Sequence, residues 1–314
     1  MDKKDGYICY IVNPNSGASS NKRLVREFKD YLESKNQRIQ TRLTTSLGHA
    51  NELGNQAAVD YDCKLVVAAG GDGTIREVAQ GLEGSDKPML TVPCGTENLL
   101  ANELGFDLHL KTLIKAFEGN NIRPLDIAMI NGRAFLSIAG FGFDGDVIHQ
   151  IHNIRKGHIN HLDYFWPLWR TFWSYPFPRI KVKLDGKEEY EGPGLVFVGN
   201  ISRYAIGLGI LKKADYGDGL LDVCIFTCNN QLTLLKLSVF TIFKIHTKSK
   251  HTIYKQCKEI DIEPIDKPVY SEIDGDPGPT LPAEIRLIAG ALKVVVPPHA
   301  KPAGIRTRLQ RMIG

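Results

Sequence analysis

The sequence predicts an α/β domain followed by a second domain built mainly of β-strands. In the first part of the chain, apolar strand-like runs alternate with amphipathic helical patterns, which is typical of a parallel sheet covered by helices. From Arg179 onward, strand-like runs separated by Gly, Asn and Pro dominate. The length of 314 residues also suits two domains.

The elements of the first part alternate in type along the chain. In the first expected helix, Leu24, Phe28 and Leu32 recur at helical spacing and define one apolar face. Strands are expected at 7–12, 39–43, 65–69 and 89–92, and helices at 22–34, 48–58, 75–82 and 110–118.

The pattern changes near residue 125. Asn131-Gly132 lies between two apolar runs and predicts a tight β-hairpin. We therefore place the domain boundary near residue 125.

Composition narrows the class of protein. Apolar residues make up 43% and charged residues 24% of the chain, which is ordinary for a globular protein. The net charge of +4 is too small to predict nucleic-acid binding, but it suits an anionic substrate or an anionic membrane surface. Six scattered cysteines without a CxxC pair favour reduced thiols in a cytoplasmic protein.

Membrane contact, if the protein makes it, is expected to be peripheral and at the inner membrane face. No run of about 18 apolar residues is present, and no signal peptide is evident. We therefore expect no transmembrane segment.

Residues 70–74, GGDGT, join an expected strand to an expected helix. Glycines let backbone N–H groups approach a ligand closely, and a helix N-terminus adds a positive dipole end. Together these features favour a phosphate group. Asp72 fits this interpretation if Mg²⁺ lies between its carboxylate and the phosphates. Taken alone, the loop also fits a tight turn with Asp72 as the helix cap.

Two further loops follow strands of the same expected sheet. The segment 13–17, NPNSG, follows the first strand, and 93–98, PCGTEN, follows the fourth. Ligands of doubly wound sheets bind at the carboxyl ends of strands. Three such loops at one edge favour a nucleotide-phosphate site over three unrelated turns.

Residues 161–177 hold eight aromatic side chains, including all three Trp. One interpretation is a helix at a lipid or membrane surface, with Arg170 facing anionic lipid. The other is a helix buried between the domains, which we expect because aromatic stripes usually belong to a core. Members of the stripe at helical spacing are Phe165, Leu168, Trp169, Phe172 and Trp173.

The motifs NPNSG, GGDGT and PCGTENLLANELG, in this order, resemble the diacylglycerol kinase catalytic family. This family includes sphingosine and ceramide kinases and bacterial soluble lipid kinases. The resemblance continues through LDIAMINGRAFLSIAGFGFDGDV, DYGDGLLDV and EIDGDPG, so it covers most of the chain.

The resemblance implies an α/β ATP-binding domain similar to that of NAD kinases and a C-terminal β-sandwich that binds the lipid acceptor. It places the active site in the cleft between the domains and returns the last residues to the first domain. We therefore expect a kinase domain at 1–125 plus about 297–314, and a lipid-acceptor domain at 126–296.

The resemblance also implies that ATP donates a phosphoryl group, with Mg²⁺, to a hydroxyl of a membrane lipid such as diacylglycerol. It assigns nucleotide binding to residues of the three loops, to the threonine directly after the expected strand 39–43, and to the start of the helix after GGDGT. These residues are Asn13, Pro14, Asn15, Ser16, Gly17, Thr44, Gly70, Gly71, Asp72, Gly73, Thr74, Ile75, Arg76, Gly95, Thr96 and Asn98.

Four carboxylates receive catalytic roles by the same resemblance. Asp72 and Asp126 belong to an acid–water–Mg²⁺ network, and Asp274 and Asp276 provide base catalysis and metal organisation. The sequence does not divide the last two roles between the two residues. The family usually has Glu at position 276, and the shorter Asp276 sets its carboxylate back.

A structural Mg²⁺ is implied near DYGDGLLDV, bound by the Asp218 side chain and by the carbonyl groups of Asp215 and Leu220. The family's common Asp-Asp-Gly is replaced here by Gly217–Gly219, and Leu99 stands where the family often has Asp.

Two alternative functions remain open from the sequence. An NAD-kinase-like enzyme shares GGDGT, although the other two loop motifs fit the lipid kinases better. A catalytically silent nucleotide- or lipid-binding protein is favoured only by Asp276. The sequence does not specify which lipid alcohol is the acceptor, nor the oligomeric state.

Overall fold

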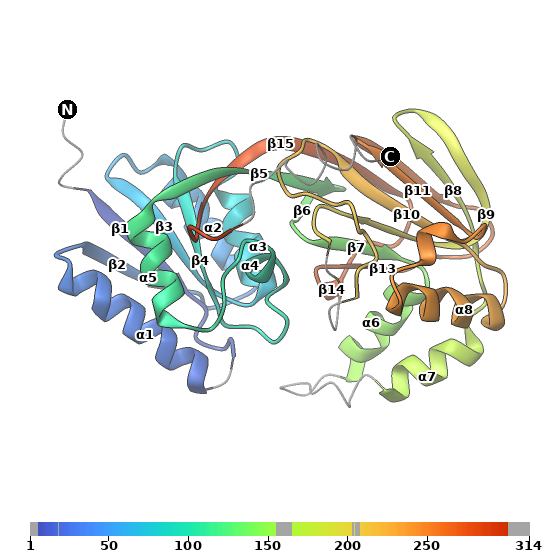
Figure 1. Cartoon of the computed structure of the whole chain (residues 1–314), viewed down its shortest axis with the longest axis horizontal. Coiled ribbons are helices and arrows are strands. Elements are labelled where there is room, and N and C mark those ends of the chain that lie inside the picture. The colour runs from blue at the N-terminus through green and yellow to red at the C-terminus, as the bar shows by residue number, and fades with distance from the viewer. Residues whose placement is uncertain (1–5, 18, 155–164, 203, 205–207, 301–314) are drawn as a thin grey trace. The chain divides into compact units, whose positions relative to one another are not determined.

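The computed structural model describes residues 6–17, 19–154, 165–202, 204 and 208–300 (Figure 1). The chain forms two compact units. Of the described residues, the first contains 6–17, 19–127, 216–218 and 288–300. Residues 301–314, which the sequence analysis also assigned to the kinase domain, lie outside the described residues. The second contains residues 128–215 and 219–287. Segments 216–218 and 288–296 thus pack with the first unit, although the sequence analysis placed them in the second domain.

The first unit contains a parallel sheet with strand order β2-β1-β3-β4-β15. Its central strands are almost wholly buried and apolar, as expected for a parallel sheet covered on both faces. The parallel α/β arrangement predicted from the sequence is confirmed. The strands are β1 (Tyr7–Val12), β2 (Arg38–Leu43), β3 (Cys63–Gly70), β4 (Pro88–Pro93) and β15 (Ala283–Val296).

The helices of the first unit lie where the apolar periodicity predicts them, within a few residues. Leu24, Phe28 and Leu32 are all buried on the inner face of α1. The helices are α1 (Ser19–Ser34), α2 (His49–Val59), α3 (Asp72–Gly81), α4 (Leu99–Glu103) and α5 (Leu110–Gly119).

The second unit contains a β-sandwich, also as predicted. One antiparallel layer follows the order β15-β12-β8-β9, with β5 and β6 beside β15, and the other follows β14-β13-β7-β9-β10-β11. Strand β9 contributes to both layers, and apolar side chains of both layers share one core cluster. Strand β5 (Asn121–Ile130) begins in the first unit and ends in the second. The other strands are β6 (Arg133–Phe135), β7 (Ile138–Phe141), β8 (Arg179–Leu184), β9 (Lys187–Gly199), β10 (Leu221–Thr227), β11 (Thr252–Cys257), β12 (Glu259–Pro264), β13 (Ser271–Ile273) and β14 (Asp276–Pro277).

The second unit also contains helices, so the expectation of an all-β domain is too simple. Leu234 and Leu237 of α8 pack with Phe197 and Phe226 in a second apolar cluster, which gives the helical layer its attachment to the sheet. The helices are α6 (Phe143–Ile154), α7 (Phe165–Ser174), α8 (Gln231–Ile242) and the short 3₁₀ helix η4 (His246–Lys248).

The expectation that the aromatic stripe is buried is wrong. Residues 165–174 are helical, but Trp166, Trp169 and Trp173 are 72%, 49% and 60% exposed. Among the side chains of α7 that the structure describes, Pro167 and Thr171 are buried and Phe172 packs against the second apolar cluster. Periodicity predicted the helix, but it does not distinguish a core stripe from a stripe on the outer side of a helical layer.

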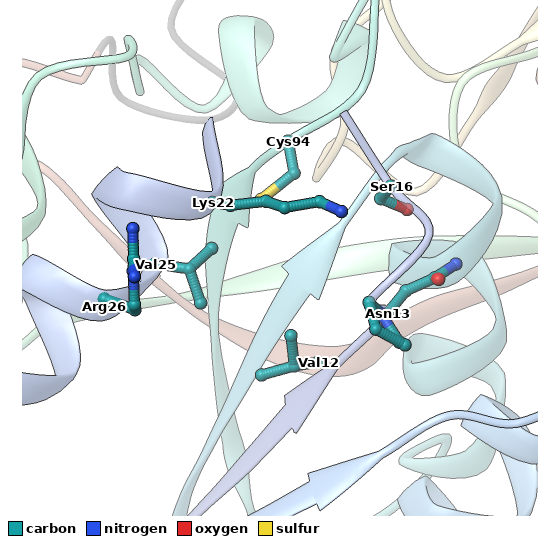
Figure 2. A pocket seen from close by; sticks show the side chains of 8 residues that line it. Val12, Asn13, Ser16, Lys22, Val25, Arg26 and Cys94 are labelled. Carbon is teal, nitrogen blue, oxygen red and sulfur yellow. The ribbon is translucent and has the colours of Figure 1, made fainter. Parts of the chain in front are cut away.

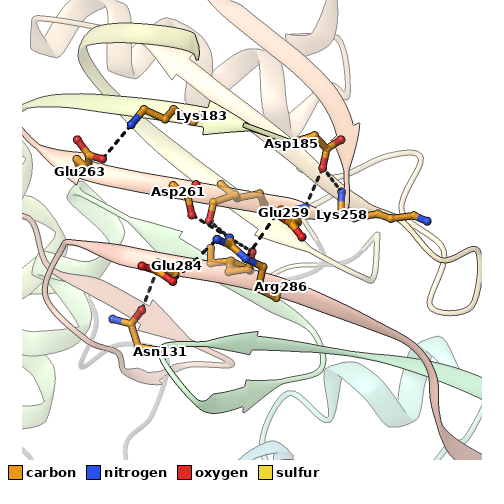
Figure 3. A network of polar contacts seen from close by, with 11 residues as sticks. Asn131, Lys183, Asp185, Lys258, Glu259, Asp261, Glu263, Glu284 and Arg286 are labelled. Carbon is orange, nitrogen blue, oxygen red and sulfur yellow. Dashed lines mark hydrogen bonds and ion pairs between the residues drawn. The ribbon is translucent and has the colours of Figure 1, made fainter. Parts of the chain in front are cut away.

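The hairpin predicted at Asn131-Gly132 joins β5 to β6, with both turn residues at positive φ. Asn131 Oδ1 accepts a hydrogen bond from the Glu284 N–H at 2.8 Å, which ties the turn to β15 (Figure 3). In the same network Arg286 pairs with Asp261 at 2.8 Å. Such surface pairs contribute little stability individually, so we assign the stability of this unit to its apolar core.

We expect Gly81→Ala to lower the free energy of unfolding by about 1–3 kcal/mol, because a Cβ there overpacks the α2–α3 contact. That Cβ would lie 2.7 Å from the Asn55 backbone nitrogen and 2.9 Å from Gly54 Cα. Urea unfolding followed by circular dichroism measures the effect. The matched control is Gly119→Ala, also at the last residue of a helix, where the nearest atom is 3.4 Å away. Equal stability of the two variants would contradict the packing argument.

Candidate functional site

Three loops follow β1, β3 and β4 and are held together by hydrogen bonds. Asn13 donates from its backbone N–H to the Ala69 carbonyl and from Nδ2 to Thr74 Oγ1, both at 3.0 Å. The Cys94 N–H donates to the Gly70 carbonyl at 2.9 Å. The structure therefore brings together the three loops that the sequence singled out.

Glycines allow these loops to touch through their backbones. A Cβ on Gly95 would lie 2.9 Å from Gly71 Cα and 3.1 Å from Asn98 Oδ1. Gly17 has φ +76° and packs against the Cys94 carbonyl, where a Cβ has no room. The loops thus need glycine at these positions because their backbones pack closely together, whether or not a ligand is bound.

A pocket of about 430 Å³ lies beside the first loop (Figure 2). This volume is within the range of small-molecule sites. Figure 2 shows the Lys22 amine directed toward the loop that carries Ser16. The lining residues are Val12, Asn13, Pro14, Ser16, Lys22, Val25, Arg26 and Cys94.

Lys22 and Arg26 were missed by the sequence analysis. They lie four residues apart on α1, so both reach the same side of the helix and bring positive charge to the pocket. The signal was present as basic residues one turn apart just after NPNSG, but the same spacing is common on solvated helix faces.

Several residues that the sequence analysis assigned to nucleotide binding are buried or hydrogen-bonded within the protein. Ile75 and Arg76 are 0% and 4% exposed, and Ile75 belongs to the core. The Asn98 side chain hydrogen-bonds both the N–H and the carbonyl of Gly95, which fixes the third loop. Thr44 is buried, and its N–H donates to the Val12 carbonyl at 2.9 Å. These residues can therefore shape the site, and their ligand contacts stay predictions.

Asp72 is the first residue of α3, and Gly71 before it has an extended conformation. This position sets a carboxylate beside the backbone N–H groups at the start of the helix. Carboxylate oxygens are hard ligands that suit Mg²⁺. The donor set at Asp72 is therefore compatible with the predicted metal.

Asp126 lies on β5 and is only 2% exposed. Its N–H donates to the Tyr216 carbonyl at 2.8 Å, and its Oδ1 accepts from the Gly290 N–H at 2.7 Å. Asp126 thus links three separate segments of the first unit. Its predicted role in a metal network is additional to this structural one.

In the second unit, Asp274 and Gly275 form the tight turn between β13 and β14, with φ of 50° and 84°. The Asp274 carboxylate accepts hydrogen bonds from three backbone N–H groups at 2.9–3.1 Å, which belong to Leu136, Ser137 and Ile138. These bonds occupy much of the accepting capacity of the carboxylate. Asp276 is half-buried and is the first residue of β14, directly after this turn.

A cluster near this turn contains two acidic residues to which the sequence analysis gave no role. A Cβ on Gly140 would lie 2.5 Å from Asp144 Oδ2 and 3.2 Å from Glu272 Oε1, so the two carboxyl groups share the space beside this glycine. Tyr204 donates a hydrogen bond to Asp144, and the Gly275 N–H donates to Glu272 Oε2 at 2.8 Å. Burial, then the charge of Asp144, raises the pKa of Glu272 well above its usual value.

The predicted structural Mg²⁺ site stays a prediction. Asp215 is 6% exposed. Burial, and to a lesser degree the charge of Asp215, raises the pKa of the nearby Asp222 to about 6. Among the described residues, no group of three or more His, Cys, Asp or Glu side chains is placed to hold a metal ion. The predicted site differs from such a group, since it uses the side chain of Asp218 and carbonyl oxygens of Asp215 and Leu220.

Family models match both parts of the chain. A model described as "Diacylglycerol kinase catalytic domain" matches residues 7–130. One described as "YegS C-terminal NAD kinase beta sandwich-like domain" matches residues 137–296. The two matches follow the α/β part and the β-sandwich part of the fold.

Relatives and solved structures agree with these models. A diacylglycerol kinase of Bacillus subtilis (strain 168) is 28% identical over 91% of this chain and 95% of its own length. One of Mycobacterium tuberculosis (strain CDC 1551 / Oshkosh) is 32% identical over 77% of this chain and 80% of its own. A crystal structure of a diacylglycerol kinase from Bacillus anthracis str. Sterne has the same fold, with a TM-score of 0.69 at 21% identity, covering 95% of this chain and 99% of that one.

The fold and the matched models define the class of this protein as a kinase with an α/β catalytic domain followed by a β-sandwich. The chain belongs to the diacylglycerol kinase catalytic-domain family. The resemblance found in the sequence motifs is confirmed.

We expect Glu272→Gln to reduce the pH dependence of stability above pH 4.5, the usual pKa of a glutamate. A buried acid with a raised pKa keeps its proton in the folded state after the unfolded state has released it. Wild-type stability therefore falls as pH rises through this window, by up to about 1.4 kcal/mol per pH unit. Urea midpoints measured across pH 4.5–8 report the slope.

The control for this experiment is Glu83→Gln, at an exposed glutamate, which should keep the wild-type slope. A Glu272→Gln protein with the same slope as wild type would show that Glu272 is ionised in the folded state.

Proposed function

We propose that this protein transfers the γ-phosphoryl group of ATP to a hydroxyl of a membrane lipid, most readily diacylglycerol. The observation that supports this proposal best is the interlocking of three glycine-containing loops at the ends of β1, β3 and β4, beside a pocket with two basic residues. The relatives that the chain matches are named diacylglycerol kinases, which favours that acceptor.

On the donor side, the loops and α1 supply the groups that phosphates need. Backbone N–H groups at the start of α3 and in the loops suit the phosphate oxygens. Lys22 and Arg26 add positive charge at the pocket, which favours a triphosphate. Phosphoryl transfer depends mostly on such positioning and charge neutralisation.

Asp72 is the residue we assign to Mg²⁺ on the donor side, with Asp126 as the second carboxylate of the network. When bound, Mg²⁺ neutralises the charge that spreads over the transferred phosphoryl oxygens. Asp126 has one oxygen bonded to the Gly290 N–H, so its carboxylate is held in a fixed orientation. The protein's own contribution is therefore to position both carboxylates before the nucleotide arrives.

On the acceptor side, we assign proton acceptance to Asp276 and a positioning role to Asp274. Asp274 already accepts three backbone hydrogen bonds, which occupy its carboxylate oxygens and fix the turn. Asp276 lies two residues on in the same rigid hairpin, with partial solvent access. A carboxylate in this position can take the proton that the lipid hydroxyl releases as it attacks.

The first experiment is a phosphate-transfer assay with ATP labelled at the γ-position, Mg²⁺, and mixed micelles of several lipid alcohols. NAD is offered in a parallel reaction. Labelled lipid supports the proposal and identifies the acceptor class, whereas labelled NAD alone favours the NAD-kinase-like alternative. ATP binding without any labelled product favours a catalytically silent binding protein.

We expect Asp72→Asn and Asp276→Asn each to lower kcat by at least about a hundredfold, because each removes a charge that acts on the reacting groups. Circular dichroism should show an unchanged fold. Asp276→Glu restores the residue type usual in the family and should keep activity within about tenfold of wild type, since it retains the carboxylate. Full activity of Asp276→Asn would assign the proton to another group.

We expect Lys22→Gln to weaken ATP binding by about tenfold, the loss expected for one charge-assisted hydrogen bond. The matched control is Arg23→Gln, which removes the same charge from the next residue of α1, outside the pocket lining. Titration with a fluorescent ATP analogue measures both. Similar affinities of the two variants would mean that Lys22 does not contact the nucleotide.

A further inference from the structure

The outer side of α7 carries large exposed apolar side chains. All three Trp of the chain lie on this helix, at positions 166, 169 and 173, and each is about half exposed or more. The inner side is held by Phe172, which packs against the apolar cluster that also contains Leu234 and Leu237 of α8. The exposed Trp side chains therefore belong to a helix whose other side is fixed to the core.

Helix α8 continues this surface. Leu232, Leu235 and Ile242 are 80%, 51% and 61% exposed. The end of α7 meets the start of α8, because Gln231 Nε2 donates to the Trp173 carbonyl at 3.4 Å, and Figure 1 shows both helices in the helical layer of the second unit. We call the side chains of Trp166, Trp169, Trp173, Leu232, Leu235 and Ile242 the α7–α8 surface.

The charged side chains of these two helices and of the segment after α8 are all positive. No Asp or Glu occurs between Asp163 and Asp185, or between Asp222 and Glu259, so both helices lack acidic residues. Lysines follow α8 at positions 244 and 248, and both are exposed. They lie near Lys212, whose pKa is lowered by burial and by the charges of Lys248 and Lys244. Exposed apolar side chains are thus bordered by a cluster of lysines.

This combination fits an anionic lipid bilayer better than a second copy of the chain. Trp side chains favour the membrane–water interface, and lysines next to an apolar surface can reach the headgroups. A symmetric dimer through the same surface would bring the lysine cluster of each copy toward that of the other. None of the described helices is long and apolar enough to span a bilayer, so contact would be made from one side.

We propose that the α7–α8 surface binds the interface of a bilayer that contains anionic lipid, with the Trp side chains entering the apolar boundary and Lys244 and Lys248 facing the headgroups. This inference deepens the proposed lipid kinase function, and its consequence for catalysis rests on that function. The membrane contact itself requires no turnover. It would bring the protein to the place where a water-insoluble lipid alcohol is present.

The test uses the full chain with vesicles of phosphatidylcholine alone or mixed with phosphatidylglycerol. Because all three Trp lie on α7, fluorescence excited selectively at Trp, and not at the 11 Tyr, reports this helix alone. We expect co-sedimentation with the mixed vesicles, a blue shift of emission, and quenching by lipids brominated on the acyl chains. Absence of vesicle binding, or binding without quenching, would overturn the proposal.

Two variants separate the apolar and the charged contributions. Trp166→Ser with Trp173→Ser should weaken vesicle binding by at least about tenfold and leaves Trp169 as a reporter. Lys244→Gln with Lys248→Gln should weaken binding to anionic vesicles by about fivefold per lysine and leave binding to neutral vesicles unchanged. The matched controls are Tyr61→Ser, at an exposed aromatic residue, and Lys111→Gln with Lys115→Gln, at exposed lysines of α5. Equal losses in the controls would contradict the assignment to this surface.

Activity assays distinguish this proposal from the proposed function. On vesicle-borne diacylglycerol both variants should lose activity, whereas on short-chain diacylglycerol dispersed in water they should match wild type. Wild-type vesicle binding without phosphorylation of either substrate would refute diacylglycerol as the acceptor and leave the membrane contact standing. Phosphorylation of the dispersed substrate without vesicle binding would support the proposed function and refute the membrane contact. A wild-type dimer that becomes monomeric in the Trp variant would assign the surface to self-association and overturn the proposal.

Discussion

Close backbone contact between three loops is the constraint on which the candidate site depends. The parallel register places the ends of the strands level with one another, since Val12 pairs with Ala69 and Ala69 pairs with Val92. The chain must then turn away from three adjacent strands in a small volume. It can do so only because Gly71 and Gly95 meet without side chains between them. This contact therefore fixes the position of the pocket beside the first loop and of the start of α3.

Much of the first unit could be predicted from the sequence because local pattern and tertiary environment agree there. The apolar runs of β1 and β3 are too short for helices and are bounded by glycine loops, which leaves a buried parallel strand as the simplest interpretation. The second unit was harder. Helices α6 and α8 lie between strands, and α8 is apolar on several sides, so its pattern lacks the polar face by which a surface helix is usually recognised.

In the candidate site, too, some residues could be predicted from local sequence pattern and others could not. Asn13, Gly71 and Gly95 were found because their loops follow strands that end at one edge. Lys22 and Arg26 were not found, because a basic pair one helical turn apart has the same pattern whether it faces water or a pocket. Asp144 and Glu272 meet only through the packing of α6 against β13, which no local pattern encodes. Exposure of the Trp side chains of α7 likewise depends on what packs against the helix.

The passage of β15 through both units has a consequence for how the chain can be divided. Within the segment 288–296, Lys293 and Val294 pair with Pro88 and Met89 of β4 in the parallel sheet, although they lie far from β4 along the chain. A fragment ending near residue 127 would leave β4 as an open edge, with unpaired N–H and carbonyl groups along a buried apolar strand. Such an edge is a template for association with other chains. The first unit therefore cannot be obtained as a soluble fragment by cutting the chain once, and any dissection must carry the last strand back by fusion or circular permutation.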